Sequence, residues 1–174
     1  MNYADIKIAD VANGEGVRVS IFVSGCTHHC KGCFNQEAWD FNYGKTFDEQ
    51  CVNRILKELD NSYIKGLSIL GGEPLEPKNQ KGLLPLLRKV KEKYPEKDIW
   101  CYTGFKFDED VMGKMYKDID ETKELLSYID VIVDGKFEED KKDLKLRFRG
   151  SSNQRILDVQ KTLKTHQLIN YDLK

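Results

Sequence analysis

Four short apolar runs alternate with longer amphipathic stretches along this chain. Each run has the length of a β-strand and is bounded by charged or turn-forming residues; the runs are Val17–Val23, Gly66–Leu70, Asp98–Tyr102 and Asp130–Val133. Because helical patterns separate the runs, we expect parallel strands joined by right-handed crossovers. The pattern therefore predicts an α/β fold. It leaves open whether the sheet is doubly wound or forms a barrel.

The stretch between the first two runs predicts a helix. Thr46, with a glutamate three residues later, forms a capping box, and an apolar residue then recurs every four positions. The recurring residues are Phe47, Cys51, Ile55 and Leu59. We therefore interpret Cys51 as a core residue. Cys101, in the third run, is likewise expected to be a small buried apolar residue.

Two further helices are expected between the later runs. One is predicted to begin near Asn79 and to end before Pro95, because proline cannot continue a helix. A weaker pattern extends from about Asp108 to Tyr128, with an expected break around residues 118–121. The residues after Asn153 show a weaker pattern.

Length and charge exclude several classes of protein. The chain has 174 residues, which suits one domain, and its 28 basic and 29 acidic side chains give a net charge of -1. This balance argues against nucleic-acid binding through a general positive field. No apolar run reaches the roughly 20 residues that span a bilayer, and the first residues resemble no targeting segment. We expect a cytoplasmic protein with no membrane partner.

Three of the five cysteines lie close together, directly after the first predicted strand. Cys26, Cys30 and Cys33 form a C-x3-C-x2-C pattern, and thiolates favour soft metals and iron-sulfur clusters. A structural zinc site uses four protein ligands, whereas three leave one coordination position open. His28 or His29 could complete a zinc site, although the chelate would be strained, so a zinc-stabilised binding module stays an alternative. A ferredoxin-like electron carrier would need a fourth cysteine.

Chemically distinctive residues follow each of the other predicted strands. The segments are GGEP at Gly71–Pro74, Thr103–Gly104 and DGKF at Asp134–Phe137. Loops at the carboxyl ends of parallel strands meet at one edge of a sheet, so all four loops should face one cavity. In GGEP the glycines allow a ligand to approach the backbone, and a carboxylate suits an ammonium group. A tight strand-to-helix turn is the alternative interpretation.

The combination of these segments resembles the radical S-adenosylmethionine (SAM) enzymes. More narrowly, it resembles the activase family of anaerobic (class III) ribonucleotide reductase, in the blocks GEGVRVSIFVSGCTHHCKGCFN, LGGEPLEPKN, DIWCYTGF, DVIVDGKFEED and RGSSNQR. The resemblance reaches to about Arg155. It implies a shortened, incomplete (β/α) barrel of about four to six strand-helix units. Residues 1–155 would form this radical SAM domain, and residues 156–174 a C-terminal tail that is helical or partly ordered.

The resemblance also implies a cofactor and a reaction. Cys26, Cys30 and Cys33 would hold one 4Fe-4S cluster per chain, and the amino and carboxylate groups of SAM would bind the fourth iron. One electron from the cluster would cleave SAM, and the deoxyadenosyl radical would take hydrogen from a glycine of the partner reductase. No catalytic residue is expected beyond the cluster and SAM, because the cofactor carries the hard chemistry.

Further contacts with SAM follow from the resemblance alone. Residues around the last cysteine would lie against the adenine, the GGEP segment would meet the amino end, and the DGKF segment would lie near the cosubstrate and the incoming partner loop. The cofactor-binding residues are thus expected to be Gly32, Cys33, Phe34, Gly71, Gly72, Glu73, Asp134 and Lys136. For Lys136, a solvated side chain is the alternative.

Two positions depart from the pattern of this family. Gly32 stands where many members have an aromatic residue, so the adenine contact would depend on Phe34 and on the backbone. Glu15 stands where proline is usual. Arg149 and Arg155, in the last block, are candidates for contact with the partner or the cosubstrate.

The expected partners are the large subunit of anaerobic ribonucleoside-triphosphate reductase and an unidentified low-potential electron donor. The activase of another glycyl-radical enzyme, such as pyruvate formate-lyase, is the alternative within the same class. The sequence leaves open whether the chain forms a homodimer.

Overall fold

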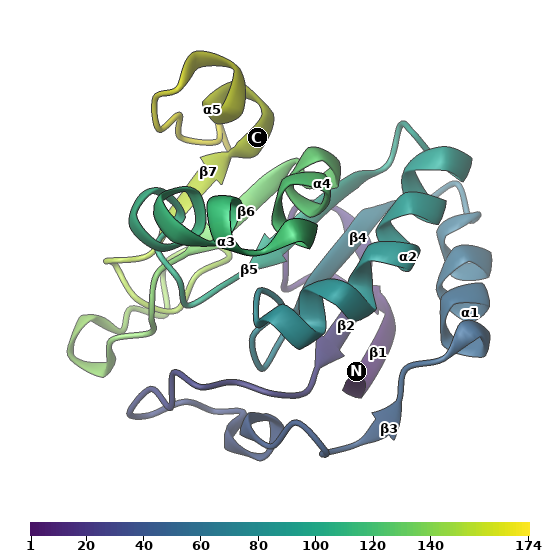
Figure 1. Cartoon of the computed structure of the whole chain (residues 1–174), viewed down its shortest axis with the longest axis horizontal. Helices are drawn as coiled ribbons and strands as arrows, with labels where there is room; N and C mark the ends of the chain where they lie inside the picture. The colour runs from purple at the N-terminus through teal and green to yellow at the C-terminus, as the bar shows by residue number, and fades with distance from the viewer.

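A seven-stranded mixed β-sheet organises the computed structural model, which describes residues 1–174 (Figure 1). The strand order across the sheet is β3-β1-β2-β4-β5-β6-β7. The strands are β1 (Asn2–Asp10), β2 (Val17–Val23), β3 (Lys45–Thr46), β4 (Ile64–Gly71), β5 (Asp98–Tyr102), β6 (Val131–Asp134) and β7 (Arg155–Asp158).

The four central strands are the four that the sequence predicts. β2, β4, β5 and β6 pair in parallel in that order, while β1 and β7 are antiparallel to their neighbours. Each parallel strand is added on the same side of the one before it. A doubly wound sheet would reverse this direction. The α/β class is confirmed, and the sheet is wound in one direction, with β3 and β7 at its two edges.

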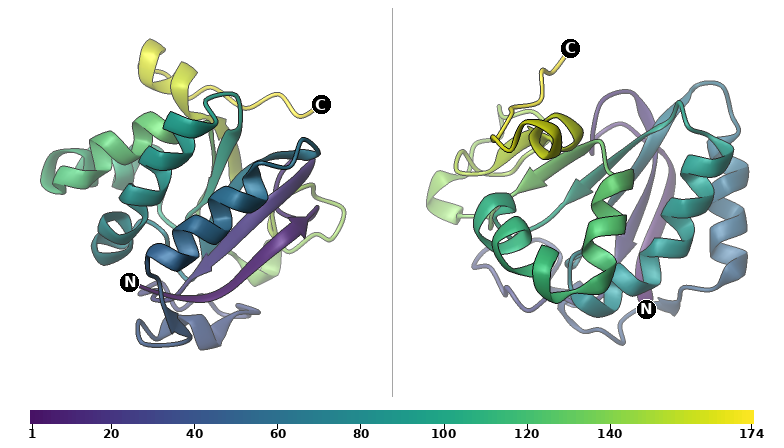
Figure 2. Two further views of the ribbon diagram at one scale, coloured as in Figure 1. Left: turned by 90° about the vertical axis from the view of Figure 1, so that its right-hand side faces the viewer. Right: turned by 45° about the horizontal axis from the view of Figure 1, so that its top comes forward.

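Helices connect the parallel strands and cover one face of the sheet (Figures 1 and 2). The α-helices are α1 (Glu49–Leu59), α2 (Pro77–Lys93), α3 (Tyr116–Asp118), α4 (Asp120–Tyr128) and α5 (Val159–Thr165). Two 3-10 turns, η1 (Gln36–Trp39) and η3 (Glu139–Lys141), and a π-helix, η2 (Phe107–Met115), complete the structure. No helix has both the length and the apolar character that a bilayer crossing requires.

The N-cap of the first helix lies two residues later than predicted. The side chain of Asp48 accepts a hydrogen bond from the Cys51 amide at 3.0 Å, whereas Thr46 lies in β3. The capping box assigned to Thr46 is therefore wrong, and Asp48 is the N-cap. The apolar stripe is confirmed, because Cys51, Ile55 and Leu59 are buried.

The other helical predictions are confirmed, with small shifts at their ends. α2 begins at Pro77, two residues before the predicted Asn79, because proline suits the first turn of a helix. The stretch from 108 to 128 is helical, and it is interrupted by the extended backbone of Ile119, within the expected break. The three antiparallel strands β1, β3 and β7 are missing from the predicted set.

Strand residues alternate between two unlike faces. Helix-facing side chains such as Ile69 and Cys101 join the main apolar core with α1, α2 and α4. Cys51 and Cys101 are both buried there, as expected. The opposite, open face carries Arg18 and Trp100, which are fully buried. A segment between β6 and β7 and the C-terminal tail cover part of this face, through Phe148 and other residues packed near Trp100.

Candidate functional site

The carboxyl ends of all four parallel strands open on one cavity of about 580 Å³. Every one of the four loops with distinctive chemistry contributes to its wall, which confirms their predicted convergence. From these loops the lining residues include Cys26, His28, Cys30, Cys33, Phe34, Gly71, Gly72, Thr103, Gly104, Gly135 and Phe137. The cavity therefore joins the three clustered thiols to the glycines that follow β4.

The segment of residues 24–35, here called the cluster loop, is anchored at its start by backbone hydrogen bonds. The Gly25 amide donates to the Ala38 carbonyl at 2.7 Å, and the Cys26 amide donates to the Trp39 carbonyl at 3.1 Å. Gly25 has a φ of +106°, and a Cβ atom there would lie 2.2 Å from the Phe41 ring. Glycine is therefore required where the chain leaves β2.

The three thiols differ in burial. Cys26 is 8% exposed, and Cys30 and Cys33 are partly exposed. Burial raises the pKa of the Cys26 thiol to about 11 and also raises the pKa of Cys30. Both are neutral thiols when no cation is near. A bound metal centre would favour their thiolate forms.

The donor set fits a cluster with one incompletely ligated iron. The three thiols line one cavity, while Cys51 and Cys101 are buried on the other side of the sheet, so no fourth cysteine is available. No group of three or more His, Cys, Asp or Glu side chains is spaced to hold a single metal ion. A cluster places its thiolates on separate irons rather than on one ion.

Glu73 lies beneath the cavity wall and is fully buried. Its carboxylate is within hydrogen-bond distance of four protein groups from three segments of the chain. These are the Leu75 amide at 2.8 Å, the Thr103 hydroxyl at 2.8 Å, the Gly104 amide at 2.7 Å and the His28 ring nitrogen Nε2 at 2.7 Å. Glu73 thus connects the cluster loop to the turns after β4 and β5.

A second carboxylate from the same turn also holds the cluster loop. Glu76 accepts hydrogen bonds from the Thr27 amide at 3.0 Å and from the Thr27 hydroxyl at 2.6 Å. The sequence reasoning missed this residue. The signal was present in EPLEP, where a second glutamate precedes a proline that begins a helix, but nothing local indicates which segment it contacts.

Asp134 and Lys136, the two DGKF residues expected to bind the cofactor, do not line the cavity. Asp134 is buried and accepts hydrogen bonds from the Arg155 guanidinium at 2.6 and 3.0 Å and from the Phe107 amide at 2.7 Å. The carboxylates that pair with Arg155 raise the pKa of its guanidinium, so this side chain always carries a positive charge. Lys136 is exposed, and its carbonyl accepts a bond from Asn153. The contacts of Asp134 and Lys136 with a cosubstrate stay predictions.

The two residues beside the last cysteine face different surroundings. Phe34 lines the cavity and is 96% exposed. Gly32 has a φ of +78°, and a Cβ atom there would lie 3.0 Å from the side chain of Glu139. Gly32 therefore faces η3 rather than the cavity. The adenine contacts expected for both residues stay predictions.

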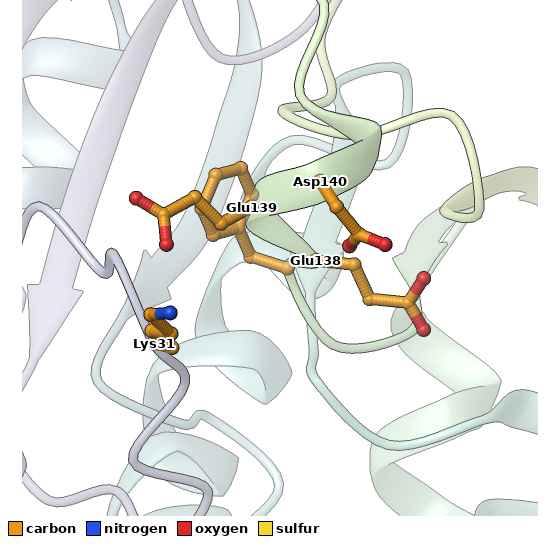
Figure 3. Close-up of a pocket in the computed structure, with 5 residues that line it drawn as sticks. Lys31, Glu138, Glu139 and Asp140 are labelled. Carbon is orange, nitrogen blue, oxygen red and sulfur yellow. The ribbon is translucent and has the colours of Figure 1, made fainter.

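A charged hollow of about 340 Å³ lies on the η3 side of the cluster loop and is separate from the main cavity. Figure 3 shows Lys31 on the cluster loop facing Glu139 on η3, with Glu138 and Asp140 beyond. Glu138, Glu139 and Asp140 follow DGKF directly in the sequence. They place negative charge beside the cluster loop.

One wall of the main cavity was not anticipated from the sequence. It is formed by the segment of residues 142–150 and by the turn after β1. The lining residues from these regions are Ala12, Asn13, Lys142, Asp143, Leu144, Leu146, Phe148, Arg149 and Gly150. In the sequence, the apolar residues of segment 142–150 stand among charged ones. Such a pattern does not indicate a cavity. Arg149 was singled out as a contact candidate and does line the cavity.

Comparison with known proteins identifies the class of this site. A family model described as a 4Fe-4S single cluster domain matches residues 12–157. This match covers the cluster loop, all four parallel strands and most of the cavity wall.

Individual relatives identify the family more narrowly than this model does. The chain is 46% identical over 158 residues to the anaerobic ribonucleoside-triphosphate reductase-activating protein of Pasteurella multocida, covering 90% of this chain and 96% of that protein. Proteins of the same name from Enterobacteria phage T4 and Escherichia coli K12 are 44% and 41% identical over 156 residues, covering 90% and 88% of this chain and 93% and 96% of their own lengths. The chain therefore belongs to the family of anaerobic ribonucleoside-triphosphate reductase-activating proteins, and the recognised resemblance is confirmed.

Proposed function

We propose that this chain is a radical SAM enzyme that generates a glycyl radical on anaerobic ribonucleoside-triphosphate reductase. The observation that carries the proposal is the convergence of exactly three clustered thiols and two strand-end glycines on one cavity. When bound, the reduced cluster would supply one electron that cleaves a carbon-sulfur bond of SAM, giving methionine and a deoxyadenosyl radical that would take a hydrogen atom from a glycine of the reductase. The names of the relatives support the choice of partner.

In this proposal the polypeptide positions the reactants and limits access of water. Cys26, Cys30 and Cys33 hold the cluster, and Gly71 and Gly72 line the cavity where the amino end of SAM would bind. Gly72 has no room for a side chain, since a Cβ atom would lie 2.6 Å from the Gly25 carbonyl oxygen. The apolar wall supplied by residues such as Leu146 and Phe148 favours exclusion of water.

The proposal also includes the domain type, the partners and the cellular compartment. Winding in one direction is the strand order of an incomplete barrel, so we assign residues 1–155 to a radical SAM domain of this kind, with residues 156–174 as its tail. The partners are the reductase large subunit and a low-potential electron donor in the cytoplasm. A homodimer stays open.

Anaerobic reconstitution with iron and sulfide tests this function directly. The protein should take up one 4Fe-4S cluster per chain, release deoxyadenosine from SAM under reduction, and give the electron paramagnetic resonance (EPR) signal of a glycyl radical when mixed with the reductase. A cluster-loaded protein that cleaves SAM but produces no radical on the reductase would refute the choice of partner. The same signal on pyruvate formate-lyase would then support the alternative activase.

A further inference from the structure

The imidazole of His28 is held firmly inside the protein, although it belongs to a loop. Its side chain is 6% exposed, and its Nε2 lies 2.7 Å from Glu73 Oε2. Its ring also packs edge-on against Phe105, with 4.3 Å between ring centres. By contrast, the adjacent His29 is exposed and stacks on Trp39 without contacting either carboxylate. The two neighbouring histidines therefore have different surroundings.

Hydrogen bonds occupy Glu73 completely. A carboxylate offers about four acceptor directions, and the structure fills two on each oxygen: Oε1 with Leu75 and Thr103, and Oε2 with Gly104 and His28. His28 is the only one of these partners that comes from the cluster loop. A fully buried carboxylate that loses a donor is left with an uncompensated acceptor, which costs free energy. The pairing is therefore strongly favoured.

The glycine after β5 is adapted to this histidine. A Cβ atom on Gly104 would lie 2.6 Å from His28 Cδ2 and 2.7 Å from His28 Nε2. Any larger residue at 104 would therefore displace the ring from Glu73. The turn after β5 thus provides both the Gly104 amide that orients the carboxylate and the space that the imidazole occupies.

We propose that His28 is a positioning residue that fastens the cluster loop to Glu73 and thereby keeps the cysteines on either side of it in place. His28 lies between Cys26 and Cys30, so tying its ring to the rigid turn after β4 restricts both thiols. The inference rests on the proposed function for the role of those thiols. It also means that an ammonium group reaching Glu73 must share an oxygen with two of these four donors.

Variants of His28 test this role in the full-length reconstituted protein. His28→Ala should release iron to a ferrous chelator about 10-fold faster than the wild type, the lower range for loss of a group that orients metal ligands. His28→Gln keeps an N–H donor and should recover most of this loss. His29→Ala is the matched control in the same loop and should release iron at the wild-type rate. Equal rates for His28→Ala and the wild type would overturn the proposal.

Separate readouts distinguish positioning from contact with the cosubstrate. The cluster-loaded His28→Ala variant should have a KM for SAM no higher than the wild type, because an acceptor on Glu73 becomes free. A KM raised about 10-fold with normal cluster retention would assign His28 to the cosubstrate and refute the positioning role. A wild-type protein that takes up no cluster would instead refute the proposed function.

The contact itself is tested without any cluster. In the apo-protein, Gly104→Ala should lower the melting temperature when His28 is present and should have little effect in the His28→Ala background, because the clash is then removed. Such coupling is expected only between residues in contact. Equal effects of Gly104→Ala in both backgrounds would contradict the geometry on which the inference depends.

Discussion

The two faces of the sheet use the same strands for different purposes. The helix-covered face is a continuous apolar core that contains Ile69 and Cys101. The open face buries polar and aromatic groups: the Arg18 guanidinium donates to the Ser68 hydroxyl at 2.7 Å and pairs with the Asp98 carboxylate at 2.7 Å, beside Trp100. A continuous apolar core characterises the first face, whereas specific polar pairing and the cavity characterise the second. Side chains that alternate along each strand therefore give the two faces different compositions.

Cysteine substitutions should show the largest difference between the cavity and the helix-covered core. Cys30→Ala should abolish cluster uptake and deoxyadenosine release, because it removes one of only three thiols at the cavity. Cys101→Ala, a similar change in the helix-covered core, should leave both unchanged and only lower stability. Iron and sulfide content and deoxyadenosine release measure the difference. Full turnover by Cys30→Ala would remove this residue from the ligand set.

The buried cation of the open face should matter for stability more than any exposed charge. Arg18→Met should lower the free energy of unfolding by about 3–5 kcal/mol, because the substitution removes the guanidinium that pairs with Asp98 and donates to the carbonyl oxygens of Glu15 and Leu67. Urea denaturation measures the change. The surface pair of Arg88 and Glu124 provides the comparison, and Arg88→Met should lower stability much less, because solvent screens this pair. If Arg18→Met lowered stability as little as Arg88→Met does, the open face would not depend on its ion pair.

The C-terminal tail should stabilise the open face by a smaller amount. Tyr171 packs edge-on against Trp100, with ring centres 5.5 Å apart, and its hydroxyl donates to Glu15 at 3.2 Å. Tyr171→Ala should cost about 1–2 kcal/mol, from loss of an aromatic pair and one hydrogen bond. Tyr63→Ala, at an exposed position, should change stability by less than about 0.5 kcal/mol.

Fluorescence provides an independent check on the tail. In a Trp39→Phe background, Trp100 is the only tryptophan, so Tyr171→Ala should shift its emission to the red as water reaches the ring. An unshifted emission would show that the tail does not shield Trp100.

The smallest effect should be a pH dependence at Glu15. Burial opposes ionisation, but hydrogen bonds from the Lys174 amide, Lys65 and Tyr171 together hold the pKa of Glu15 below its ordinary value of 4.5. Stability from this group is therefore complete above pH 4.5 and is lost as pH falls through the lower pKa of the folded state. The stability difference between the wild type and Glu15→Gln should shrink below pH 4.5. A difference independent of pH would contradict the tail contact.

Sequence reasoning worked best where one local pattern determines the structure. β2 and β5 match their predicted bounds, because each is an apolar run between clear boundaries. β1 was missed because charged residues alternate with its few apolar ones and only Ile6 and Asp10 are buried. The N-cap was misplaced because Thr46 and Asp48 are both good capping residues, and tertiary pairing placed Thr46 in β3.

The convergence of the four loops was predictable from the sequence, but the hydrogen bonds that hold them in place were not. The spacing of the cysteines and the loops after parallel strands predicted one cavity, which the structure confirms. The bonds of His28 and Thr27 to Glu73 and Glu76 join residues more than 40 positions apart, so no local pattern reveals them. The same is true of Asp134, whose partner Arg155 lies on a strand that the sequence did not predict.

The central claim is that three thiols leave one iron of the cluster for SAM. EPR spectroscopy of the anaerobically reconstituted and reduced protein, recorded with and without SAM, tests this claim most directly. The account predicts the signal of one reduced 4Fe-4S cluster per chain, and a change in its shape when SAM is added, because SAM binds the free iron. Colourless protein with stoichiometric zinc, or a cluster signal that SAM leaves unchanged, would contradict it.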